Sequence, residues 1–188
     1  MVRSIVFAAA FICVAPRVFG EVDFTPKDSF YLAEATRVPD VAFQNGSRKI
    51  TYSPPGGWTL SGGGRKLSLT PPDTVQAGAV MQTDPIAAVV PATEENVKAY
   101  SDVAVGLLPR EASKVTVVDA AICSMRIAQR SMVEVTLTYV LFGQHFTSNI
   151  LFLPYDKEQI IFQVTARNAD YTPLAKAFRA SLFSLQGL

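Results

Sequence analysis

The stretch M-V-E-V-T-L-T-Y-V-L-F, residues 132–142, decides the fold of this chain. Apolar residues alternate along it with polar ones, as the order Val133, Glu134, Val135, Thr136, Leu137, Thr138, Tyr139 shows. Alternation of β-branched and aromatic residues with a period of two is typical of a strand that has one buried and one wetter face. We therefore expect a sheet built around this strand.

Turn residues and changes of period predict the neighbouring elements. Short strands are expected at 49–53, 58–60, 66–70 and 77–82, and further strands at 115–118, 121–128, 145–153 and 159–167. Helical spacing of apolar residues predicts helices at 94–108 and 173–185, while 29–37 fits a short helix or an edge strand. The fold class expected for residues 21–188 is a single α+β domain, an antiparallel sheet flanked by helices.

The first 20 residues have the pattern of a secretory signal peptide. A positively charged start precedes an apolar run at 5–14, and Val18 and Gly20 suit positions −3 and −1 of a cut before Glu21. The run is short for a bilayer span. A retained anchor is the alternative, because Pro16 makes the cleavage region irregular. We expect an exported protein, periplasmic or secreted, with no stable membrane span after cleavage.

Charge and cysteine content exclude some classes of function. The formal net charge of the chain is +1 and becomes −1 without Arg3 and Arg17, so phosphate-driven binding of nucleic acid is not expected. Removal of the leader takes away Cys13 and leaves Cys123 as the one cysteine, so no internal disulfide is expected. Cys123 is expected to be a small buried hydrophobic residue.

Turn positions predict a register for the strands after residue 120. A turn at 129–131 would place Arg126 opposite Glu134, and a turn at 143–144 would place Thr138 opposite Asn149. One face would then be apolar. An odd-residue loop or a bulge after Tyr155 would place Phe162 and Val164 on the same face. This expected apolar face comprises Cys123, Met125, Ile127, Val133, Val135, Leu137, Phe146, Ile150, Phe152, Phe162 and Val164.

The opposite face would gather polar side chains: Arg126, Glu134, Thr136, Thr138, Thr147, Asn149, Gln163, Thr165 and Arg167. This polar face is interpreted in two ways. It is a solvated sheet face with an ordinary Arg126–Glu134 pair, or a platform for a polar ligand with arginines as anion handles. The candidate ligand-binding residues of that platform are Arg126, Glu134, Thr138, Asn149 and Arg167.

The order of strands, helix, strands and helix resembles the Mog1/PsbP-like fold superfamily. The resemblance covers residues 43–185 and rests on I-T-Y-S-P-P-G-G-W at 50–58, the isolated helix at 94–108, and F-R-A-S-L-F at 178–183. It implies an α/β/α sandwich. It also implies a binding or assembly protein rather than an enzyme, with no functional residue carried over.

Catalytic, metal and cofactor motifs are not found in the sequence. His145 is the single histidine and is expected in a hairpin. A transition-metal site usually needs several His or Cys ligands, and a Ser-His-Asp arrangement would have to use this one histidine, so neither is expected. The glycines at 62–64 lack the spacing of a phosphate-binding loop. Trp58 is expected to anchor the core.

Three hypotheses of function follow. The first is a non-catalytic exported domain that binds a protein partner in the cell envelope. The second is a carrier of a small polar or anionic ligand on the polar face, and the third is a hydrolase using His145. No cofactor is expected.

Overall fold

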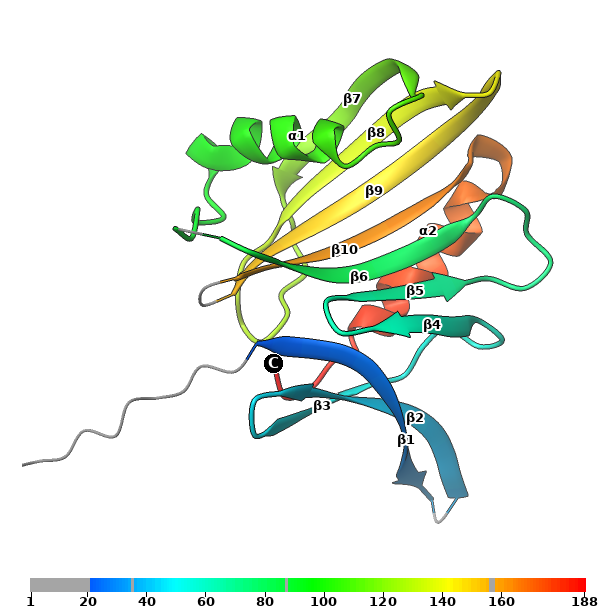
Figure 1. Ribbon diagram of the computed structural model, residues 1–188, viewed down its shortest axis with the longest axis vertical. Helices are drawn as coiled ribbons and strands as arrows, with labels where there is room; N and C mark the ends of the chain where they lie inside the picture. Colours follow the sequence, from blue (N-terminus) through cyan, green and yellow to red (C-terminus); the bar gives the residue numbers. More distant parts are fainter. Residues whose placement is uncertain (1–20, 35, 87, 156–157) are drawn as a thin grey trace, which may run out of the picture.

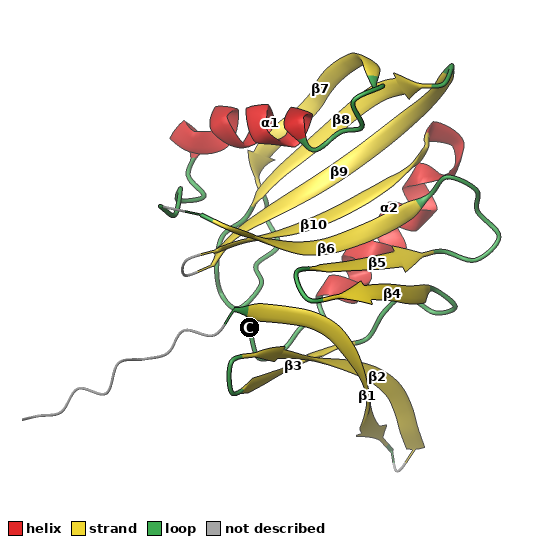
Figure 2. Cartoon of the chain, in the orientation of Figure 1, coloured by secondary structure: helices red, strands yellow, loops and turns green. Residues whose placement is uncertain are grey.

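Two antiparallel sheets and two helices make up the fold (Figures 1 and 2). The computed structural model describes residues 21–34, 36–86, 88–155 and 158–188. A three-stranded sheet has the order β1-β2-β3, and a seven-stranded sheet has the order β4-β5-β6-β10-β9-β8-β7. The α+β class predicted from the sequence is confirmed.

The elements have the following bounds. The strands are β1 (Val22–Ala33), β2 (Thr36–Asn45), β3 (Arg48–Tyr52), β4 (Thr59–Gly63), β5 (Lys66–Thr70), β6 (Gly78–Pro85), β7 (Ser113–Ile122), β8 (Val133–Leu141), β9 (Gln144–Tyr155) and β10 (Glu158–Arg167). The helical elements are the 3-10 turn η1 (Glu94–Asn96), α1 (Val97–Gly106) and α2 (Asn168–Leu182).

The helices lie on opposite faces of the large sheet, so each face has its own core (Figure 1). On the α1 face, Tyr100 and Ala104 of α1 pack on Val135, Leu137 and the residues around them. The α2 face holds the larger core. That core includes Val22, Phe24, Phe43, Ile50, Tyr52, Met81, Cys123, Met125, Ile127, Leu151, Phe162, Val164, Phe178 and Leu182.

The small sheet was not anticipated as a separate unit. The segment 29–37, left open between helix and strand, belongs to the β1–β2 hairpin. β1 joins the two sheets, because the Phe24 N–H donates to the Gly64 carbonyl at 2.7 Å. The C-terminus closes the far side: Thr51 and Gln186 exchange two backbone hydrogen bonds of 3.0 and 3.1 Å.

The helices differ from their predicted bounds mainly at α2. The first helix was predicted at 94–108, and η1 and α1 together span 94–106. α2 begins five residues earlier than Pro173 and ends before Leu185, so that proline lies inside it rather than at its start. Neither helix in the described part of the chain has the length and hydropathy required to cross a bilayer.

The predicted pairing of Arg126 with Glu134 is wrong. β7 ends at Ile122, and Ala121 is the residue opposite Glu134. Residues 123–132 leave the sheet and turn at Ala128 and Gln129, both with positive φ. The apolar side chains in this connection are buried as expected, but in the α2-face core rather than beside Val133.

The register after β8 is shifted from the prediction. The turn lies at Phe142 and Gly143, both with positive φ, so Thr138 faces Thr147 and Thr136 faces Asn149. This shift of two residues leaves each side chain on its predicted face.

The placement of Phe162 and Val164 in one core with Val133 is also wrong. β10 pairs Phe162 with Leu151. Only two residues connect Tyr155 to Glu158, so the odd-residue loop that would place Phe162 and Val164 on the face of Val133 is not present. Ile161 lies on that face instead and joins the α1-face core.

Candidate functional site

Two of the five candidate residues meet on the α2 face. The Asn149 amide nitrogen donates to Glu134 Oε1 at 2.9 Å and to Thr136 Oγ1 at 3.0 Å. Both side chains point the same way because β8 and β9 place Glu134 opposite Leu151 and Thr136 opposite Asn149.

The other three candidates do not join this pair. Thr138 is on the same face but lies opposite Thr147, farther along the strand. Arg167 is on the α1 face, where its guanidinium donates to the Gln76 side-chain oxygen at 2.9 and 3.1 Å. Arg126 is exposed in the connection between β7 and β8. The five residues therefore do not line one site.

The cation that meets Glu134 is Arg179 of α2, which the sequence analysis missed. Arg179 Nη1 forms an ion pair with Glu134 Oε1, and its Nη2 lies 3.2 Å from Cys123 Sγ. Arg179 follows Phe178, whose side chain is buried against β10 and β9. A helical residue next to a buried one lies at the edge of the packed face, and that position was the available signal.

The charges in this cluster alter each other's pKa. Burial is the largest single effect on Glu134 and opposes its ionisation. The hydrogen bonds from Arg179, Asn149 and Cys123, together with the Arg179 charge, outweigh burial and lower the pKa of Glu134. Burial raises the pKa of the Cys123 thiol, and Glu134 raises it further. Cys123 is therefore a neutral thiol rather than a nucleophilic thiolate at neutral pH.

A pocket of about 220 Å³ lies between α2 and the strands β8 and β9. Glu134, Asn149 and Arg179 line it with apolar residues of both layers, and Lys176 and Tyr171 complete its wall. Because Arg179 and the Asn149 amide are already bonded to Glu134, the polar groups of the pocket serve first to hold α2 on the sheet.

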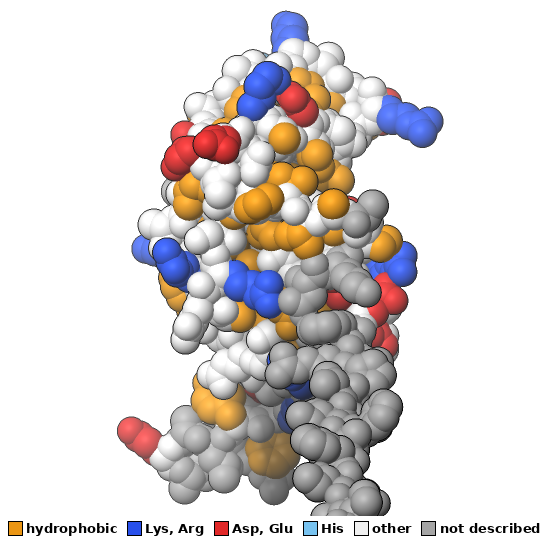
Figure 3. All heavy atoms as spheres, turned by 90° about the vertical axis from the view of Figure 1, so that its left-hand side faces the viewer, with side chains coloured by type: hydrophobic (Ala, Val, Ile, Leu, Met, Phe, Trp, Pro, Cys, Tyr) orange, Lys and Arg blue, Asp and Glu red, His pale blue; other side chains and the backbone are white. Residues whose placement is uncertain are grey.

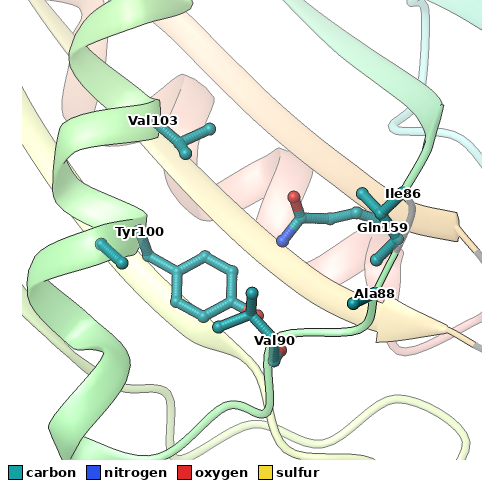
Figure 4. Close-up of a pocket in the computed structure, with 7 residues that line it drawn as sticks. Ile86, Ala88, Val90, Tyr100, Val103 and Gln159 are labelled. Atoms are coloured by element: carbon teal, nitrogen blue, oxygen red, sulfur yellow. The ribbon is translucent and has the colours of Figure 1, made fainter.

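A second, apolar pocket lies on the other face beside α1, with a volume of about 70 Å³. Figure 4 shows side chains from α1 and from the segment after β6 converging on it, with Gln159 of β10 reaching between them. The Tyr100 hydroxyl donates to the Val90 carbonyl and closes one end. Its lining comprises Ile86, Ala88, Val90, Ala99, Tyr100, Val103 and Gln159.

Exposed apolar side chains surround this pocket. Val89, Val90 and Val103 have 42%, 41% and 47% of their surface exposed. Figure 3 shows apolar side chains gathered in the middle of the face that lies at the left in Figure 1. We name these three valines, with Ile86 and Ala88, the α1 patch. Contiguous exposed apolar residues around a pocket are typical of interaction surfaces.

The hydrolase hypothesis depended on partners for His145. In the described part of the chain, the His145 side chain has no hydrogen bond to a hydroxyl or a carboxylate, and it is exposed near the β8–β9 turn. A group of three or more potential metal ligands is likewise not found among the described residues. Trp58 packs on the core, with its ring stacked 6.4 Å from that of Phe178.

Comparison with known proteins gives a likeness in structure but none in sequence. No protein-family model matches the chain, and no curated protein matches it in sequence. The solution structure of cyanobacterial PsbP (CyanoP) from Synechocystis sp. PCC 6803 is similar, with a TM-score of 0.47 and 10% identity. The similarity covers 74% of this chain and 86% of that one. This likeness concerns the fold alone.

Proposed function

We propose that this chain is an exported, non-catalytic domain that binds another protein through the α1 patch. The observation that carries the proposal is the apolar pocket between α1 and the segment after β6, with exposed valines at its rim. Burial of apolar surface is the main favourable term in protein association. The occupant we propose is one aliphatic side chain of the partner, since five of the seven residues that line the pocket are Val, Ile or Ala.

Gln159 adds a polar contact to this apolar surface. Its amide reaches into the pocket from β10 (Figure 4). A few placed polar groups in an otherwise apolar pocket fix the orientation of what binds. We infer that the Gln159 amide bonds a backbone group of the partner next to the inserted side chain.

Two valines of α1 provide a matched test. Val103 lines the pocket, whereas Val105 is also exposed, at 40%, but does not line it. We expect Val103→Lys to lose at least tenfold of partner capture from the native envelope fraction, and Val105→Lys to retain it. Equal capture by the two variants would contradict the proposal. Capture of lipid instead of protein would do so as well.

A second candidate function is binding of a small polar ligand in the 220 Å³ pocket beside α2. Lys176 supports it, since this cation lines the pocket and has no ion pair among the described residues. Calorimetric titration with small carboxylates tests this candidate. We expect Lys176→Gln to abolish binding, and no heat of binding from any of the carboxylates would exclude it.

A further inference from the structure

Glu158 is a buried carboxylate placed where the main sheet meets β1. Only 7% of its surface is exposed, and its Oε1 accepts a hydrogen bond from the Val22 backbone N–H at 3.0 Å. Val22 is fully buried. The next buried residue of β1 is Phe24, whose backbone N–H donates a hydrogen bond to the Gly64 carbonyl. Glu158 therefore binds the first residue of β1.

This carboxylate is poorly compensated. Among the described residues no cation forms a salt bridge with Glu158, and Arg65 acts on it only at longer range. Burial raises the pKa of Glu158 most and the Glu21 carboxylate raises it further, whereas the Val22 N–H and the Thr83 hydroxyl lower it. Buried charges in proteins normally have a direct partner of opposite sign.

The sequence predicts where such a partner would arise. Hydrolysis of the Gly20–Glu21 bond by a signal peptidase consumes one water and leaves a carboxylate on Gly20 and an amine on Glu21, protonated at neutral pH. Successive backbone nitrogens lie at most ~3.7 Å apart. The new ammonium group would therefore form within ~7 Å of Glu158 Oε1, before any rotation of Glu21 brings it closer.

We propose that Glu158 is the receptor for the mature N-terminus, so that removal of the leader creates an ion pair that locks β1 onto the large sheet. The uncut chain has a neutral amide at the same place, so the lock forms only on processing. This inference rests on the export part of the proposed function and is independent of the α1 patch.

The test compares two N-termini in two backgrounds. One purified chain begins at Glu21 and the other carries a Gly-Ser extension before it, each with Glu158 or with Glu158→Gln. The α-amino pKa of each chain is measured by NMR titration. In the chain that begins at Glu21 and retains Glu158, we expect this pKa to lie at least one unit above the ordinary value of about 7.7–8.0. In the other three chains we expect the ordinary value. Asp84→Asn, on neighbouring β6, is the control that should not change it.

Stability gives a second readout that does not require Glu158→Gln to fold. At pH 7 we expect the unfolding equilibrium constant of the chain beginning at Glu21 to be about fivefold smaller than that of the extended chain, as about one kcal/mol implies. This advantage should be lost as the pH rises through the raised pKa of the amine. The other charges facing the pair are the Glu21 side chain and Arg65, which form their own ion pair.

Three results would overturn the proposal. They are an ordinary α-amino pKa beside an intact Glu158, equal stability of the two N-termini, and sequencing that finds another first residue on the exported protein. None of them bears on partner capture by the α1 patch, so the two proposals fail separately.

Discussion

Arg179 of α2 forms an ion pair with Glu134 of β8 across the α2 face of the large sheet. The same guanidinium reaches Cys123, the first residue after β7. One side chain thus connects the closing helix to β8 and to the segment that follows β7, and Asn149 of β9 completes the network through Glu134. This contact joins residues 45 positions apart.

Loss of the Arg179 charge should destabilise the fold. In Arg179→Met the apolar stem is kept, but half-buried Glu134 loses its cation and retains only neutral partners, the Asn149 amide and the Cys123 thiol. We expect the free energy of unfolding to fall by about 1–2 kcal/mol in urea denaturation. Arg167→Met, which removes a guanidinium bonded to exposed Gln76, is the control and should cost about 0.5 kcal/mol or less. Equal losses in the two variants would contradict a special role for Arg179.

The same pair makes stability depend on acid pH. The folded-state pKa of Glu134 is lowered from its ordinary value of 4.5, so its ionised form contributes stability above that pH. The contribution is lost as the pH falls through the lowered pKa. We expect Glu134→Gln to flatten the dependence of unfolding free energy on pH between about 5 and 3. If the unfolding free energy of Glu134→Gln depends on pH as steeply as that of the unsubstituted chain, other carboxylates are responsible for the acid dependence.

Gly187 is required where the C-terminus crosses β3. Its φ is +87°, and an added Cβ would lie 2.3 Å from the Lys49 carbonyl oxygen. We expect Gly187→Ala to break the Thr51–Gln186 hydrogen bonds and to cost about 1–3 kcal/mol. Gly64 also has a positive φ but has no atom within 4 Å of such a Cβ, so Gly64→Ala should cost less. Calorimetric melting compares the two.

Cys123 should report opening of the α2 face. Its thiol is buried and its pKa is raised by burial, so in the chain beginning at Glu21 it should react slowly with Ellman's reagent at pH 8. Urea should accelerate the reaction in step with unfolding. The exposed neighbouring position supplies the control, since Ser124→Cys should add a thiol that reacts at once. Immediate reaction of the unsubstituted chain would contradict the burial of Cys123.

Local pattern was sufficient for β8 and for the faces of its side chains. The alternation at 132–142 predicted β8 and its buried residues because each side chain there contacts neighbours that follow the same period of two. The shift of the β8–β9 turn by one position escaped prediction, since Phe142 adopts a positive φ that its residue type disfavours.

Contacts between residues far apart in the sequence could not be predicted from local sequence patterns. The loop at 123–132 has the apolar spacing of a strand, yet its side chains pack into the α2-face core after the chain has left the sheet. Arg179 and Glu134 lack any shared local signal, so Arg126 was the nearest candidate for a partner. Arg126 and Arg167, which the platform interpretation placed on one face, therefore lie apart.

The most direct test of the central claim, that the α1 patch binds a partner protein, is site-specific photocrosslinking in living cells of the source organism. A benzophenone side chain at position 103 should yield one discrete adduct with another protein, and Ala88→Asp should abolish it by placing a charge in the pocket lining. The same probe at position 105 should yield little of that adduct. No adduct at 103, or an adduct equally strong at 105, would contradict the account.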